Sequence, residues 1–198
     1  MLRALARQLG RPSGVAGRVL VAPMLNRGNA KMHAAAVAAL GVQDGDHVLD
    51  VGFGGGGALR RLLDDTPAAK VVGAEISSDM LAAARKRYAG EARVAIVEGA
   101  AESLPLADGA VQRALSTHTV YFWPDGGAGA RELHRVLAPG GRLVLGAGEK
   151  ASMEKRRIHQ EGFTLYDPAE LVDLLRDAGF RDARTVSAPG GVLAIGER

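Results

Sequence analysis

Short runs rich in β-branched residues alternate with longer helical stretches along most of this chain. The runs lie at residues 47–53, 70–77, 93–99, 110–117 and 142–148. A strand that is followed by a helix and then by another strand favours a parallel sheet covered by helices on both faces. The sequence therefore predicts an α/β doubly wound fold.

The end of the chain breaks this alternation. Residues 167–180 predict a helix, because Asp167 can cap it, Pro168 suits its first turn and Gly179 ends it. Two short strands are expected at 181–188 and 191–197. Since the Pro189-Gly190-Gly191 link between them is too short for a parallel crossover, they must pair antiparallel.

The N-terminal part predicts two helices, at 2–9 and 29–40, with an exposed turn at 24–29. Residues 1–43 contain no acidic group, and their basic residues are Arg3, Arg7, Arg11, Arg18, Arg27 and Lys31. We expect this segment to form a basic helical arm or lid that attracts an anion, although a solvated helix face has the same pattern.

Composition limits the class of protein. The 198 residues, 47% of them hydrophobic, are enough for one domain, with the arm at 1–43 and the core at 45–198. The absence of cysteine excludes a disulfide framework, a thiolate metal site and a cysteine nucleophile. Because no run reaches membrane-span length and no secretory signal is recognisable, we expect a cytoplasmic protein.

Glycines follow the first predicted strand and precede a helix, which is the place where a nucleotide binds in such folds. Gly52, Gly54 and Gly56 allow a ligand to approach the backbone and the helix amides. With Gly57 the same segment also fits the dinucleotide pattern. Glu75, which ends the second strand, is suited to ribose hydroxyls in either case.

Three features disfavour a nicotinamide oxidoreductase. Asp50 would repel a pyrophosphate, whereas it suits a cationic amino group. None of the three tyrosines is followed four residues later by lysine, so the short-chain dehydrogenase pair is missing. The antiparallel ending also differs from a dehydrogenase.

From residue 45 onward the chain resembles the class I S-adenosylmethionine-dependent methyltransferases, especially the small-molecule group that includes the ubiquinone and menaquinone biosynthesis enzymes. The resemblance lies in five ordered segments: VLDVGFGGG, VVGAEIS, EGAAESLPLADGAVQRAL, ELHRVLAPGGRLVL and DPAELVDLLRDAGF. It implies a Rossmann-like sheet of seven strands with the last one antiparallel.

The resemblance also implies a cofactor site for S-adenosylmethionine. Its residues would be Asp50, Gly52, Gly54, Gly56, Glu75, Ile76, Ala100, Ala101, Glu102 and Thr117. Glu75 would bind the ribose and Ile76 would lie against the adenine. The family usually has aspartate where this chain has Ala100, so we expect that contact to be weaker or met differently.

The segment after the fourth strand is expected to hold the catalytic groups, His118 and Tyr121. His118 could remove a proton or donate a hydrogen bond to the acceptor, and a structural histidine is the competing interpretation. Three of the eight aromatic residues, including Tyr121 and Trp123, gather here. They would form an apolar wall near the sulfonium, unless they serve packing alone.

Two basic regions could close over the acceptor. The substrate candidates are Asn26, Arg27 and His33 in the arm, Trp123, and Arg156 in the insertion after the fifth strand. Together they are compatible with a small-molecule acceptor that carries a carboxylate or phosphate, although a charge run on a solvated insertion has the same pattern. No cluster has metal-ligand spacing, so no metal is expected.

Other functions remain open at this stage. A noncatalytic nucleoside-binding or partner-binding protein would explain Ala100. A nucleic-acid methyltransferase would explain the basic arm, but residues 116–119 lack the NPPY-type segment of base-flipping enzymes, so no nucleic acid partner is expected. Weak association with a membrane surface, a monomer and a homodimer are all compatible with the sequence.

Overall fold

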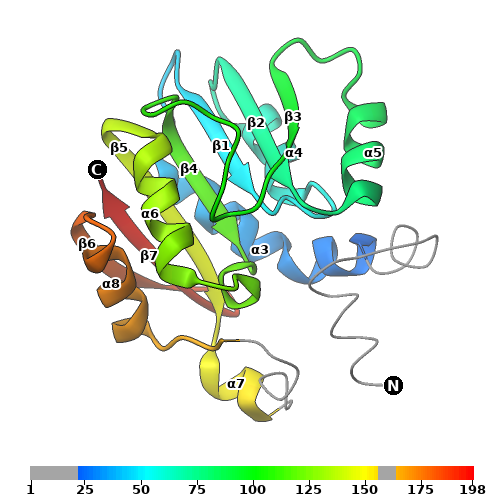
Figure 1. The fold of residues 1–198 in the computed structure, drawn as a ribbon. Coiled ribbons are helices and arrows are strands. Elements are labelled where there is room, and N and C mark those ends of the chain that lie inside the picture. The colour runs from blue at the N-terminus through cyan, green and yellow to red at the C-terminus, as the bar shows by residue number, and fades with distance from the viewer. Residues whose placement is uncertain (1–21, 156–163) are drawn as a thin grey trace.

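The fold is built on one sheet of seven strands, ordered β3-β2-β1-β4-β5-β7-β6 (Figure 1). The computed structural model describes residues 22–155 and 164–198, with side chains from residue 29 onward. The strands are β1 (His47–Val51), β2 (Lys70–Glu75), β3 (Val94–Glu98), β4 (Val111–Thr117), β5 (Leu137–Gly148), β6 (Arg181–Ala188) and β7 (Gly191–Glu197).

Strand direction matches the prediction. The pairs of β1 with β2, β1 with β4, β2 with β3 and β4 with β5 are parallel. Strand β7 is antiparallel to both β5 and β6. The doubly wound α/β sheet with an antiparallel last strand is therefore confirmed, and the carboxyl ends of the parallel strands share one edge.

Helices cover both faces of the sheet (Figure 1). They are α3 (Ala22–Leu40), α4 (Gly57–Asp65), α5 (Ser78–Arg87), α6 (Gly126–Val136), α7 (Lys150–Lys155) and α8 (Pro168–Asp177), with a short 3₁₀ turn, η2 (Val120–Phe122). One buried cluster joins the sheet to α6 and α8, and the other joins it to α3, α4 and α5. Among the described helices, none has the length and apolar character that a membrane crossing needs.

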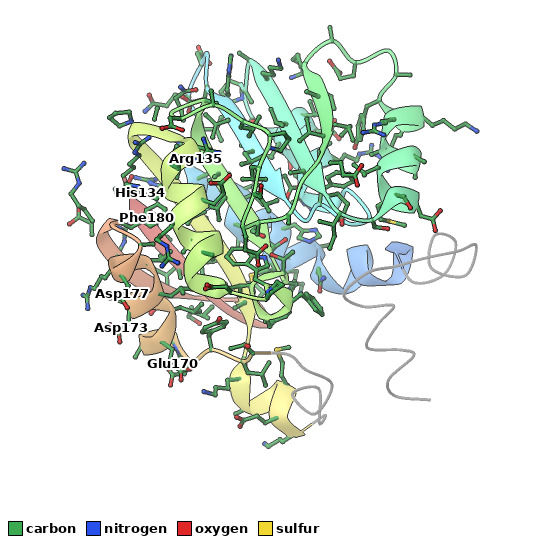
Figure 2. The ribbon with its side chains drawn as sticks, in the orientation of Figure 1. His134, Arg135, Glu170, Asp173, Asp177 and Phe180 are labelled. Atoms are coloured by element: carbon green, nitrogen blue, oxygen red, sulfur yellow. The ribbon has the colours of Figure 1, made fainter. Side chains whose placement is uncertain are left out.

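Helix α8 begins as its sequence predicts. The Asp167 side chain accepts a hydrogen bond from the Glu170 amide, and the Glu170 side chain accepts one from the Asp167 amide. Figure 2 shows α8 beside α6, where the rings of His134 and Phe180 meet edge to face with centroids 5.1 Å apart. This contact joins α6 to the short segment between α8 and β6.

Two local predictions differ from the structure. The predicted turn at 24–29 is helical, because α3 runs without interruption from Ala22 to Leu40. Burial of Met32, Ala36 and Leu40 anchors the helix, and such packing outweighs the low helix propensity of asparagine and glycine. The predicted helix at 2–9 lies outside the described residues.

The second difference concerns the start of β5. The sequence predicts a break at residues 139–141 before the strand, but β5 already begins at Leu137, which pairs with Val111. The register then shifts, and Gly140 takes a positive φ of 77°. The Pro-Gly-Gly sequence therefore bulges within the strand instead of preceding it.

Two glycines of α6 provide a test of how this helix packs against Trp123. A Cβ at Gly129 would lie 2.6 Å from the Trp123 ring, whereas at Gly127 it would meet only flexible side chains, at 3.2 Å or more. We expect Gly129→Ala to lower the free energy of unfolding by about 1–3 kcal/mol, since overpacking outweighs the gain in helix propensity. Gly127→Ala should be neutral or stabilising in the same urea titration. Equal effects of the two changes would contradict this packing.

Candidate functional site

The glycine loop, residues 52–56, lies between β1 and α4 and needs its glycines for two reasons. Gly52, Gly54 and Gly56 all have positive φ, of 69°, 49° and 74°, which disfavours other residues. A Cβ at Gly52 would also lie 2.6 Å from the Thr119 side chain, whereas one at Gly54 would have only a carbonyl oxygen at 3.9 Å. The loop is thus tightly packed at Gly52 and open at Gly54.

Glu75 joins the end of β2 to the glycine loop. Its Oε1 accepts hydrogen bonds from the Ile76 and Ser77 amides at 2.8 and 3.0 Å, and its Oε2 accepts one from the Gly54 amide at 2.9 Å. A carboxylate offers about four acceptor positions, so one on Oε2 remains for a ligand. The Glu75 carboxylate is therefore held in place before any ligand binds.

Ile76 lies next to this carboxylate with its side chain 40% exposed, an unusual value for a large hydrophobic residue. A fixed acceptor beside an apolar surface suits a nucleoside, whose sugar offers hydroxyl donors and whose base offers an apolar face. Both residues stand where the sequence places them.

Asp50 lies deeper than the sequence suggests. It is 1% exposed, and its Oδ2 has no hydrogen-bond partner. Burial, and then the charge of Glu75, raise the pKa of Asp50 to about 7, although the Leu59 amide of α4 opposes the shift. Because it is buried, Asp50 is better placed to influence the glycine loop than to contact a ligand. Its direct contact with a ligand's amino group stays a prediction.

Sequence reasoning missed Tyr88, which ends α5 and reaches the same loop. Its hydroxyl is buried without a hydrogen-bond partner and lies 3.8 Å from the place where a Cβ of Gly56 would be. Burial and the charge of Asp50 both raise its pKa. No pattern in the sequence could have indicated this approach, because it depends on how α5 packs against the loop.

The turn after β4 brings His118 and Tyr121 together. The Nδ1 atom of His118 lies 2.7 Å from the Tyr121 hydroxyl, and the His118 amide donates to the Gly146 carbonyl oxygen at 2.7 Å. His118 also takes a positive φ of 59°, a strained conformation that is common at functional sites. Burial lowers the pKa of His118, so its imidazole is neutral at neutral pH.

A second histidine, His33 of α3, approaches the same region. It is buried, and burial, His118 and Arg61 together lower its pKa to about 4. The opposite end of α3 lies at the other edge of the sheet, where Arg142 donates to the Ala39 carbonyl oxygen. Helix α3 therefore runs along the sheet. Its N-terminal part, before His33, lies toward the edge that carries the carboxyl ends of the parallel strands.

The remaining cofactor candidates lie around the turn after β3. Ala101 is buried, and Ala100 forms a bridge with Ser103. Glu102 faces α6, where its Oε1 accepts a long hydrogen bond of 3.4 Å from the Asp125 amide. Thr117, at the end of β4, is 9% exposed.

The structure does not bring every substrate candidate to the site. Trp123 is 7% exposed and belongs to the core cluster beneath α6, which favours a packing role. Arg156 lies outside the described residues, as do the side chains of Asn26 and Arg27. Their roles stay predictions.

The burial of Asp50 predicts how stability depends on pH. Because its pKa rises from 3.8 to about 7 on folding, its contribution to stability is present below about pH 4 and lost as the pH rises to about 7. We expect Asp50→Asn to remove this loss, so the variant gains stability relative to the wild type between pH 4 and 8. The gain should be on the order of a few kcal/mol in urea titrations.

Asp44→Asn, an exposed change in the turn before β1, is the matched control. A stability difference between Asp50→Asn and the wild type that stays constant across this pH range would contradict the burial of an unpaired carboxyl.

Comparison with known proteins agrees with this geometry. A family model described as "Methyltransferase domain" matches residues 49–145. The ubiquinone/menaquinone biosynthesis C-methyltransferase UbiE of Paracoccus denitrificans is 41% identical over 112 residues, which are 54% of this chain and 44% of that protein. The chain spans between 32% and 58% of the length of the first curated relatives it matches.

Solved structures cover the chain more fully. A SAM-dependent methyltransferase of Thermotoga maritima is 26% identical with a TM-score of 0.68, covering 88% of this chain and 91% of that one. A Haloferax volcanii methyltransferase, solved with its activator Trm112, has a TM-score of 0.80 and covers 99% of this chain and 96% of its own. At 23% identity this second likeness shows the fold alone.

The geometry and the comparisons indicate the same family. The geometry consists of the glycine loop, the carboxylate that ends β2 and the order of the strands. Residues 49–145 of the chain belong to the class I S-adenosylmethionine-dependent methyltransferase family.

Proposed function

We propose that the protein transfers a methyl group from S-adenosylmethionine to a small-molecule acceptor. The observation that carries this proposal is the Glu75 carboxylate, held by three backbone amides between the open side of the glycine loop and the exposed Ile76. The similarity to the Paracoccus ubiquinone/menaquinone biosynthesis C-methyltransferase supports a small-molecule acceptor.

The described residues fit the cofactor. Glu75 has an acceptor position left for a ribose hydroxyl, and Ile76 offers an apolar face to the adenine. The glycine loop leads into the N-terminus of α4, whose amides favour the negative charge of a methionine carboxylate. When bound, S-adenosylmethionine supplies a methyl group on a sulfonium, which a nucleophile displaces in line.

The acceptor would lie over the carboxyl ends of β4 and β5. His118 and Tyr121 come from the turn after β4, and His33 approaches from α3. Met153 of α7 lies against Gly148 at the end of β5, where a Cβ would be 3.0 Å from its sulfur. Such a setting aligns the acceptor and excludes water, which is most of what methyl transfer requires of a protein.

Calorimetric titration with S-adenosylmethionine, S-adenosylhomocysteine and NADH tests the cofactor without knowledge of the acceptor. We expect both sulfur nucleosides to bind with micromolar affinity and NADH not to bind. If neither sulfur nucleoside binds, the replacement of the family's usual aspartate by Ala100 would explain the loss of the cofactor. A noncatalytic protein of the same fold would then be the better interpretation.

A pair of glycine variants locates the binding site. Gly54→Val puts a side chain into the open side of the loop and should weaken S-adenosylhomocysteine binding at least tenfold. Gly45→Val carries a comparable backbone strain, with φ of 86° and no atom within 4 Å of its Cβ, but lies in the turn before β1. Gly45→Val should leave the affinity unchanged. An equal loss of affinity in both variants would contradict a cofactor site at the glycine loop.

A further inference from the structure

The pair formed by His118 and Tyr121 defines which imidazole nitrogen carries the proton. The Tyr121 hydroxyl is buried, and its hydrogen needs an acceptor. Among the described residues, the Nδ1 atom of His118, 2.7 Å away, is the partner that the geometry provides. The hydroxyl oxygen itself faces the Gly148 amide, which is a donor.

Only one assignment of protons satisfies both groups. If Nδ1 carried the proton, it would donate to the hydroxyl oxygen, and the buried hydroxyl hydrogen would have no acceptor. If Nδ1 is bare, the hydroxyl donates to it and the oxygen can accept from Gly148. A neutral imidazole with a bare Nδ1 carries its proton on Nε2.

This assignment changes the role open to His118. A base needs a lone pair, whereas the Nε2–H group of this tautomer can only donate. We propose that His118 donates a hydrogen bond from Nε2 to an oxyanion of the acceptor, so that the protein methylates small molecules that bind already ionised, as carboxylates, phenolates or enolates. This inference rests on the proposed methyl transfer.

His33, Tyr121 and Glu75 are each poorly suited to remove a proton. The pKa of His33, about 4, makes it too weak a base at neutral pH, and burial keeps Tyr121 in its neutral form. Glu75 already accepts from three amides. Arg61, which also pairs with Asp65, places one positive charge within reach of His33.

The transfer step balances without a base. A bond forms between the acceptor's nucleophilic atom and the methyl carbon, while the carbon–sulfur bond breaks and leaves its electron pair on sulfur. The negative charge of the acceptor and the positive charge of the sulfonium cancel, so no proton is released. His118 stabilises the ionised acceptor before this step and holds it in line.

Nitrogen-15 NMR of the protein saturated with S-adenosylhomocysteine tests the tautomer. We expect a bare, pyridine-type Nδ1 and a protonated, pyrrole-type Nε2 for His118. Tyr121→Phe should shift this balance toward the other tautomer, whereas Tyr166→Phe, a half-buried tyrosine on the loop before α8, should not. A protonated Nδ1 in the wild type would overturn the proposal.

Benzoate and its neutral analogue benzamide test the acceptor class. Benzoate should move the His118 Nε2–H signal and bind about tenfold more tightly than benzamide, as expected for a hydrogen bond to a charged group. His118→Gln, which keeps a donor, should preserve part of this preference, and His118→Leu should lose it. Both variants carry the same positive φ, so their difference reports the donor.

These results separate two kinds of failure. If S-adenosylhomocysteine does not bind in calorimetry, the proposed methyl transfer fails, and the same NMR measurement on the free protein still reports the tautomer of His118. If it binds but benzamide equals benzoate, the oxyanion role of His118 is wrong and the methyltransferase proposal stands.

Discussion

The hydrogen bonds of Glu75 hold the candidate site together. This single carboxylate fixes the Gly54 amide of the glycine loop and the two amides that follow β2. This link adds to the backbone hydrogen bond from the Gly52 amide to the Ala74 carbonyl oxygen, which joins the same two strand ends. Burial first, and then the charge of this same carboxylate, raises the pKa of Asp50.

Much of this arrangement could be predicted from the sequence, because it follows from local rules. Alternating strands and helices predict the parallel sheet, and the short Pro-Gly-Gly link at 189–191 predicts the antiparallel pair. Gly52 and Gly54 mark the loop because its positive φ angles favour glycine. The turn expected at 24–29 was wrong because local propensity ignores the packing that anchors α3 along the sheet.

What the sequence could not provide are contacts between distant segments. Tyr88 reaches the glycine loop only because α5 packs against it, and Trp123 enters the core because Gly129 leaves room for its ring. His118 was recognisable as a candidate, but its proton position depends on the buried Tyr121 hydroxyl. Such partners decide the chemistry of a site and leave no periodic pattern.

The ribose contact of Glu75 is the direct measure of the proposed cofactor site. The affinity of S-adenosylhomocysteine should be compared with that of its 2′,3′-dideoxy analogue, for the wild type and for Glu75→Gln. A hydrogen bond to a charged group predicts a loss of roughly tenfold or more for the analogue in the wild type, and a smaller loss in the variant. Equal affinity of the two ligands for the wild type would contradict a nucleoside bound at Glu75.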